Sequence, residues 1–203
     1  MFSQHVEHEM TRSPQMSADE ARLAVLRVAD ELFYARGVAG VVMSDIRDSS
    51  GVSMRRLYGM YPSKRELVAA WLTDRHDRWM TWFSTTVDRH VADGADPVMA
   101  TFDAIAEWVA APGYRGCAFI NSLAETSEID DVHRTIIAAH KRDLVELLAR
   151  LTTGVHPDTP PWFASALAVV LDGAIVQCTI FNSTEPLDAA RHAVHLLLET
   201  TPT

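Results

Sequence analysis

Apolar residues recur three and four positions apart ahead of Gly37, which is the spacing of one face of an α-helix. Ser17 and Glu20 form the Ser-x-x-Glu pattern of a capping box just before this run. Gly37 follows the run, at the position where many helices end in a left-handed residue. The pattern predicts a first helix over residues 18–36.

Two short helices separated by a glycine turn are predicted next. We expect Ser44 to cap the first of them, which stops at Gly51, and Ser53 to cap the second, over residues 54–60. Pro62 ends the second helix, because a proline disfavours the helical conformation in the residue before it. Two short helices joined by a tight turn are the helix-turn-helix arrangement.

A long helix is predicted over residues 64–92. It is apolar near both ends and strongly polar over residues 73–78, a pattern typical of a connector between two bodies. The chain is therefore expected to have three parts. These are a mobile N-terminal arm (1–16), a helix-turn-helix head (17–66) and a C-terminal helical domain (67–203).

The C-terminal part is predicted to be helical throughout. Apolar stripes and proline starts place helices over residues 97–111, 130–151 and 159–182 and from Pro186 onward, with a short helix or turn over residues 116–127. The sequence has neither a convincing strand alternation nor an internal repeat. The predicted fold class is all-α, with about nine helices.

Composition excludes several classes of protein. Of the 203 residues, 48% are hydrophobic and 22% charged, as in ordinary soluble domains, which argues against a disordered or fibrous chain. No apolar run is expected to span a membrane, and the N-terminus lacks the basic and apolar regions of a secretory signal. Two cysteines are too few for a disulfide framework, so we expect a cytoplasmic protein.

The net charge of −9 is unevenly distributed. Residues 1–66 contain nine basic and nine acidic side chains, whereas residues 67–203 contain nine and eighteen. Residues 53–65 hold four basic side chains and no acidic one. A compact basic site on an acidic body is compatible with DNA contact through the head, although a solvated helix face would give the same pattern.

The second short helix has the residues that a DNA-reading helix needs. Its first turn presents Arg55 and Arg56, and arginine is the commonest reader of guanine in the major groove. Tyrosine, serine and lysine side chains nearby can contact phosphates, and Ser44 lies at a helix N-terminus that favours anions. The residues expected to contact DNA are Ser44, Ser53, Met54, Arg55, Arg56, Tyr58, Tyr61 and Lys64.

Residues 25–71 closely resemble the N-terminal domain of the TetR/AcrR family of transcriptional regulators. The resemblance rests on Ala29, Leu32, Phe33 and Gly37, on Ile46, on Gly51-Val52-Ser53, on Leu57-Tyr58, and on Tyr61-Pro62-Ser63-Lys64 followed by Glu66-Leu67. It implies a homodimer that binds a palindromic double-stranded DNA operator, usually as a repressor released by a small ligand. Met54 and Gly59-Met60 depart from the family pattern, in which these positions help to hold phosphates.

The resemblance also implies an effector pocket in the C-terminal domain. A mostly apolar cavity with a few polar groups suits an apolar or aromatic small molecule, although any single one of these aromatic residues is more often part of the core. The expected pocket residues are Trp79, Trp82, Phe83, Phe102, Trp108, Phe119, Asn121, His140, Asp172, Gln177 and Phe181.

The last two helices are apolar over too wide an arc for the surface of a monomer. In the family that this chain resembles, these helices pair with their symmetry mates, so they are expected to form the dimer interface. The residues expected there are Leu167, Val170, Leu171, Ala174, Ile175, Leu196 and Leu197.

Other functions have weaker support. His192 and His195 share a helix face, but two ligands do not make a metal site, and neither a metal nor a cofactor is expected. An all-α enzyme would need a convergent set of titratable groups, which the sequence does not show. A small-molecule-binding or interaction protein with a weakened DNA head remains the main alternative, since Met54, Gly59 and Met60 have side chains that donate no hydrogen bonds.

Overall fold

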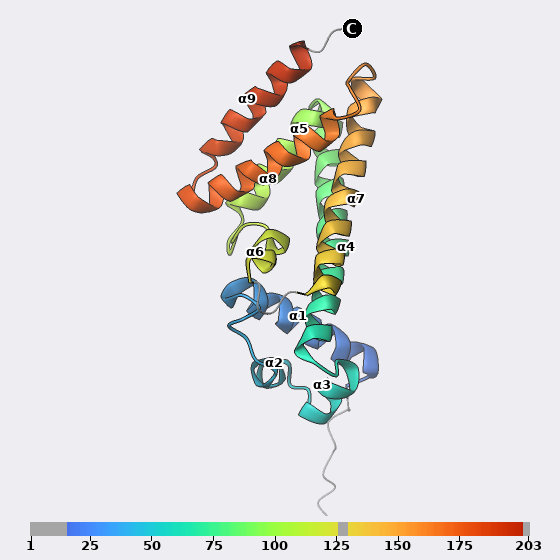
Figure 1. Ribbon diagram of the computed structural model, residues 1–203, viewed down its shortest axis with the longest axis vertical. Helices are drawn as coiled ribbons and strands as arrows, with labels where there is room; N and C mark the ends of the chain where they lie inside the picture. The colour runs from blue at the N-terminus through green and yellow to red at the C-terminus, as the bar shows by residue number, and fades with distance from the viewer. Residues whose placement is uncertain (1–15, 126–129, 201–203) are drawn as a thin grey trace, which may run out of the picture.

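A computed structural model describes residues 16–125 and 130–200, which form nine helices and no strand. In chain order they are α1 (Ala18–Arg36), α2 (Met43–Ser50), α3 (Met54–Met60), α4 (Lys64–Ala92), α5 (Pro97–Ala110), α6 (Ala118–Ala124), α7 (Asp131–Val155), α8 (Phe163–Phe181) and α9 (Glu185–Thr200) (Figure 1). The all-α prediction is confirmed. All but the last residue of the predicted arm, residues 1–15, lie outside the described residues.

Helices α1, α2 and α3 gather at one end of the molecule around the first turns of α4 (Figure 1). Their shared core contains Val25, Ile46 and Leu57, all fully buried. The ring of Trp71 on α4 packs against Phe33 on α1, with centroids 5.1 Å apart. Helix α4 therefore belongs to the head at its N-terminal end, and it continues from there into the rest of the molecule.

The second body is a bundle built on α4. Helices α5 and α7 pack along it, α8 lies against α7, and α9 packs on α8 at the edge of the bundle (Figure 1). Phe83, Phe102 and Leu148 are fully buried in its core. The short α6 sits between this bundle and the head (Figure 1), so the two bodies meet through α4, α6 and the start of α7.

Capping explains most helix boundaries. Both hydrogen bonds of the Ser17–Glu20 capping box are present, and Ser53 and Ser63 each accept a backbone N–H of the helix that follows. Ser44 was expected to cap α2, which is wrong: Val42 holds that position and Ser44 lies in the first turn. The Asp45 carboxylate accepts the Val42 N–H at 3.1 Å, so the helix starts two residues earlier, at Met43.

Helix α8 begins at Phe163, later than the predicted start, because residues 160–162 form a turn. Contrary to the sequence expectation, this 19-residue helix is long and apolar enough to cross a membrane by those two measures alone. Its inner face packs on α7 and α9 and buries Leu167, Leu171 and Ile175. A core helix passes the same length and composition test, so the result carries little weight.

Candidate functional site

The turn between α2 and α3 fixes how α3 is presented. Gly51 ends α2 in the left-handed conformation (φ 69°), which a glycine adopts at little cost. Val52 is then buried against the head core, and Ser53 starts α3. Leu57 anchors the inner side of α3 and is fully buried. Ser53, Arg55 and Tyr58 are consequently left on the exposed side of the helix.

The two arginines of α3 differ in their surroundings. The Arg56 guanidinium donates a hydrogen bond of 2.5 Å to the backbone carbonyl of Ser17, at the start of α1. Arg55 is exposed, and within residues 16–125 and 130–200 no ion pair or hydrogen bond of its side chain is found. Arg55 is therefore available to an incoming ligand, whereas Arg56 ties α3 to α1.

The remaining predicted DNA contacts are less accessible. Met54, Ser44 and Lys64 are half-buried. Tyr61 is 6% exposed and belongs to the head core, and burial raises the pKa of its hydroxyl. The expected hydrogen bond from Tyr61 to a phosphate stays a prediction, and it would require this buried side chain to become accessible. The sequence could not reveal this burial, because a tyrosine just after a helix can point either way.

A small cavity in the second body collects about half of the predicted effector-pocket residues. Six of them line it: Trp79, Phe83, Trp108, Phe119, His140 and Asp172. Their own side chains nearly fill it, leaving about 10 Å³, room for about one water molecule. The ring of Phe119 stacks on His140 with centroids 3.7 Å apart. A ligand larger than a water molecule must therefore displace some of these rings.

The polar groups of this cavity are partly paired. The Lys141 ammonium lies 2.5 Å from the Asp172 carboxylate and 3.9 Å from the Cys117 sulfur. His140 shares a hydrogen bond of 3.0 Å with His76. Burial, together with the positive charges nearby, lowers the pKa of His140 to about 3, so its ring is neutral near pH 7.

The other five predicted pocket residues do not line this cavity, and for the exposed Gln177 and Phe181 the prediction is wrong. Gln177 is exposed, as is Phe181 at 64%, because both lie on the outward face of α8. Phe102 is buried in the core, and Trp82 lines an outer cleft between α4 and α5. Asn121 donates to the Arg115 carbonyl and lines a separate hollow beside α1.

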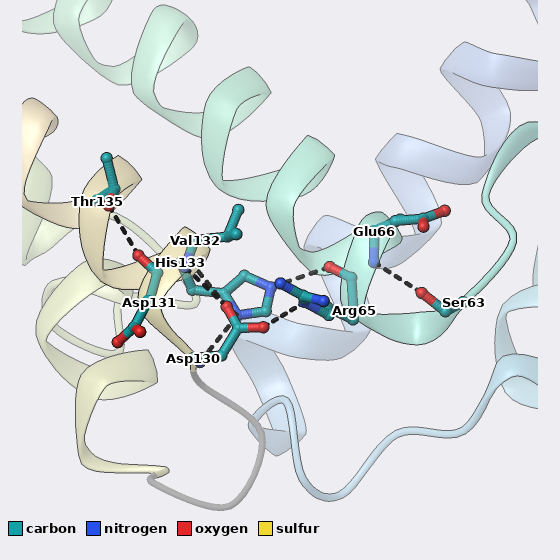
Figure 2. A network of polar contacts seen from close by, with 8 residues as sticks. All are labelled: Ser63, Arg65, Glu66, Asp130, Asp131, Val132, His133 and Thr135. Atoms are coloured by element: carbon teal, nitrogen blue, oxygen red, sulfur yellow. Dashed lines mark hydrogen bonds and ion pairs between the residues drawn. The ribbon is translucent and has the colours of Figure 1, made fainter.

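The start of α7 is attached to the start of α4, beside the head (Figure 2). The Nε2 atom of His133 lies 2.9 Å from the backbone carbonyl of Arg65, and Asp130 forms an ion pair with the Arg65 side chain. The Asp130 carboxylate also caps α7 by accepting the N–H of Val132 and of His133. The start of α7 is therefore bound to the first turn of α4 through both a backbone and a side-chain contact.

Two further contacts join the second body to α1 and the segment after it. The Arg75 guanidinium on α4 lies 2.6 Å from the Asp30 carboxylate on α1 and 4.0 Å above the Tyr34 ring. The Glu125 carboxylate, after α6, accepts the Ala39 N–H at 2.5 Å. Sequence reasoning missed both contacts, because the partners are 45 and 86 residues apart and neither pair belongs to a local motif.

The apolar face expected to form a dimer interface is present, but on different residues of α8. Leu167, Leu171, Ala174 and Ile175 are buried in the chain's own core, so assigning them to the interface is wrong. Helix α8 is apolar on both sides, and the sequence did not show which side faces inward. Its exposed apolar residues are Val169 (72% exposed), Val176, Ile180 and Phe181, alongside the exposed Leu196 and Leu197 of α9, while Val170 is half-buried.

Comparison with known proteins agrees with this architecture. Residues 25–71 match the family described as bacterial regulatory proteins, tetR family. The HTH-type transcriptional regulator TtgR of Pseudomonas putida is 35% identical over 68 residues, which are 34% of this chain and 32% of TtgR. The alignment thus spans about a third of the length of this relative.

Solved structures match over nearly the whole chain. SCO4454, a TetR-family transcriptional regulator from Streptomyces coelicolor, has a TM-score of 0.75 at 27% identity, covering 90% of this chain and 96% of that one. Reduced NemR from E. coli has a TM-score of 0.76 at 20% identity, covering 86% and 94%. The head sequence and the complete fold agree: residues 25–71 match the N-terminal domain of the tetR family, and the described chain has the fold of TetR-family regulators.

Proposed function

We propose that the chain is a cytoplasmic, DNA-binding transcriptional regulator, with residues 17–66 as the DNA-binding domain and residues 67–203 as the ligand-binding and dimerisation domain. The observation that carries the proposal is the exposed face of α3, with Arg55 projecting from a helix whose opposite side is anchored by Leu57. An exposed arginine near the start of the second helix of a helix-turn-helix suits the major groove.

The proposed DNA complex is a homodimer on a palindromic operator. The exposed apolar residues of α8 and α9 would form a shared interface, since such a patch is costly to leave in water. A two-fold dimer places its two α3 helices in successive major grooves, about 34–36 Å apart. Binding of a small effector in the second body would then change this spacing and release the operator. The protein would thus act as a repressor whose repression is ended by its effector.

The contacts between the two bodies support a route from effector to DNA. The His133–Arg65 and Glu125–Ala39 contacts connect α7 and α6 to the head. A ligand that opens the nearly filled cavity must move the side chains of α4, α6 and α7 that line it. Those movements reach α3 through α4, and a coupling of about 1–3 kcal/mol gives about a 5–150-fold loss of DNA affinity.

Fluorescence-anisotropy titration of DNA from the gene's own promoter region tests the proposal. We expect tight, sequence-selective binding that weakens steeply between a low and a high salt concentration, because bound Lys and Arg side chains release counterions from the phosphates. Absence of selective binding at either salt concentration would contradict it and favour a binding protein with a weakened DNA head. Met54, Gly59 and Met60 are the residues that would account for such weakening.

A further inference from the structure

The inner cavity is separated from an outer cleft by a wall of two tryptophans. Trp79 and Trp108 line both hollows, and their rings meet edge to face with centroids 5.7 Å apart. The outer cleft, between α4 and α5, has a volume of about 420 Å³, which falls within the range of small-molecule sites. The two hollows are therefore neighbours that share these two indole rings.

The indole nitrogen of Trp79 lacks a hydrogen-bond partner. Among the buried side-chain nitrogen and oxygen atoms of the described residues, Trp79 Nε1 is the one in this state. Leaving a buried donor unpaired is costly, and such a donor in a protein interior calls for an explanation. A ligand that places an acceptor oxygen beside Trp79 would satisfy it.

The charges around the two hollows favour a negative ligand. Arg75 also lines both of them, and its side chain is 11% exposed. The inner cavity adds Lys141, which is paired with Asp172, and the outer cleft adds Arg78 and Glu107. The two linings together therefore carry three cations and two carboxylates. His140 brings no negative charge. Donors and positive charge therefore predominate where the aromatic rings gather.

We infer that the effector is a planar aromatic carboxylate, whose ring lies against Trp79 and Trp108 and whose carboxylate accepts the Trp79 indole N–H and pairs with Arg75. This inference rests on the proposed function, and it specifies the ligand class of the same site. Stacking on the two indoles supplies apolar contact, and the single orphaned donor and the arginine fix the orientation of the carboxylate.

The same arginine connects the ligand to the head. Arg75 pairs with Asp30 of α1, and the Trp71 indole also donates to that carboxylate at 2.7 Å. A ligand carboxylate competes with Asp30 for the Arg75 guanidinium. The Asp30 carboxylate then keeps its hydrogen bond from Trp71 and its 3.2 Å ion pair with Arg78, but it loses the shorter ion pair, with Arg75. Effector binding thereby loosens the contact between α1 and α4.

Binding is tested by isothermal titration of the full chain with benzoate, 2-naphthoate and indole-3-carboxylate, each beside its neutral amide. At least one carboxylate should bind about tenfold or more tightly than its amide, as expected for a charge-assisted hydrogen bond. Trp79→Phe should lower the affinity for that carboxylate by about tenfold. Arg75→Gln should reduce the ratio of carboxylate affinity to amide affinity to about twofold or less. Arg150→Gln, at an exposed position of α7 outside both hollows, should change neither value.

The proposal is overturned if no carboxylate binds more tightly than its amide, or if the preference survives in Arg75→Gln. Hydrogen exchange of the α1 amides tests the connection to the head: exchange should speed up with the bound carboxylate, not with its amide, and should not respond in Asp30→Asn. Unchanged α1 exchange with a bound carboxylate would refute the connection. None of these measurements uses DNA, so failure of the DNA-binding proposal would be seen separately.

Discussion

His140 should make the folded protein less stable as the pH falls, and replacing it should remove that effect. The pKa of His140 is lowered from 6.5 to about 3, first by burial and then by the charges of Lys141, His76 and Arg75. The unfolded chain therefore binds a proton between about pH 3 and 6.5 that the folded chain does not bind. Stability contributed by neutral His140 is present above pH 6.5 and is lost progressively below it.

The magnitude follows from the two pKa values. When the pH falls from 6.5 to 5.0, protonation of a histidine of ordinary pKa stabilises the unfolded chain by about 1.7 kcal/mol. With a pKa near 3, His140 stays almost unprotonated in the folded chain, which therefore gains almost no stabilisation over the same range. Urea unfolding followed by circular dichroism at the two pH values, at constant protein concentration, measures the difference. His140→Phe should show a pH dependence smaller than that of the wild type by this amount.

His192→Phe is the matched control, because His192 is exposed and contacts only a backbone carbonyl. It should keep the pH dependence of the wild type even if its absolute stability differs. Parallel pH dependences of the wild type and His140→Phe would refute the reasoning. That result would mean that His140 is hydrated, or gains a compensating partner, in the folded protein.

Three other predictions follow from the contacts between and within the two bodies. Gly37→Ala should destabilise the fold by about 1–3 kcal/mol in thermal or urea unfolding, because φ is 77° and the added Cβ would lie 2.7 Å from the Glu125 carboxylate. Val169→Asp should convert the proposed dimer to monomer in sedimentation experiments while circular dichroism stays helical; an intact dimer would contradict the α8 interface. Burial opposes ionisation of Asp30, but the charge of Arg75 and the hydrogen bond from Trp71 keep the pKa of this carboxyl below its usual value. Ionised Asp30 therefore contributes stability above about pH 4 that is lost in acid, and Asp30→Asn should remove this contribution.

Local signals explain why much of the head could be predicted from the sequence. The bounds of α1, α3 and α4 agree with the predicted 18–36, 54–60 and 64–92, because serine caps and the final glycine act over three or four residues. Helix α2 starts two residues before the predicted position, because the Asp45 carboxylate, and not the Ser44 hydroxyl, accepts a backbone N–H at the start of the helix.

Tertiary contacts explain what the sequence left open. Every position of α8 near its centre is apolar or small except Asp172, so its inward side depends on how α7 and α9 pack against it. The aromatic residues of the second body were found, but only their packing separates Trp79 and Trp108 in the wall from Phe102 in the core. The ion pair of Arg75 with Asp30 could not be predicted from the sequence, because the two residues lie on different helices and are 45 positions apart.

The central claim is that α3 reads DNA through Arg55, and comparison of Arg55→Ala with Arg56→Ala on one operator tests it most directly. Anisotropy titrations against the operator and a scrambled duplex should show that Arg55→Ala loses about 1–3 kcal/mol of discrimination, the value of one bidentate base contact. Arg56→Ala should mainly destabilise the head, because its guanidinium is bound to the Ser17 carbonyl. Undiminished discrimination by a folded Arg55→Ala dimer would contradict the account.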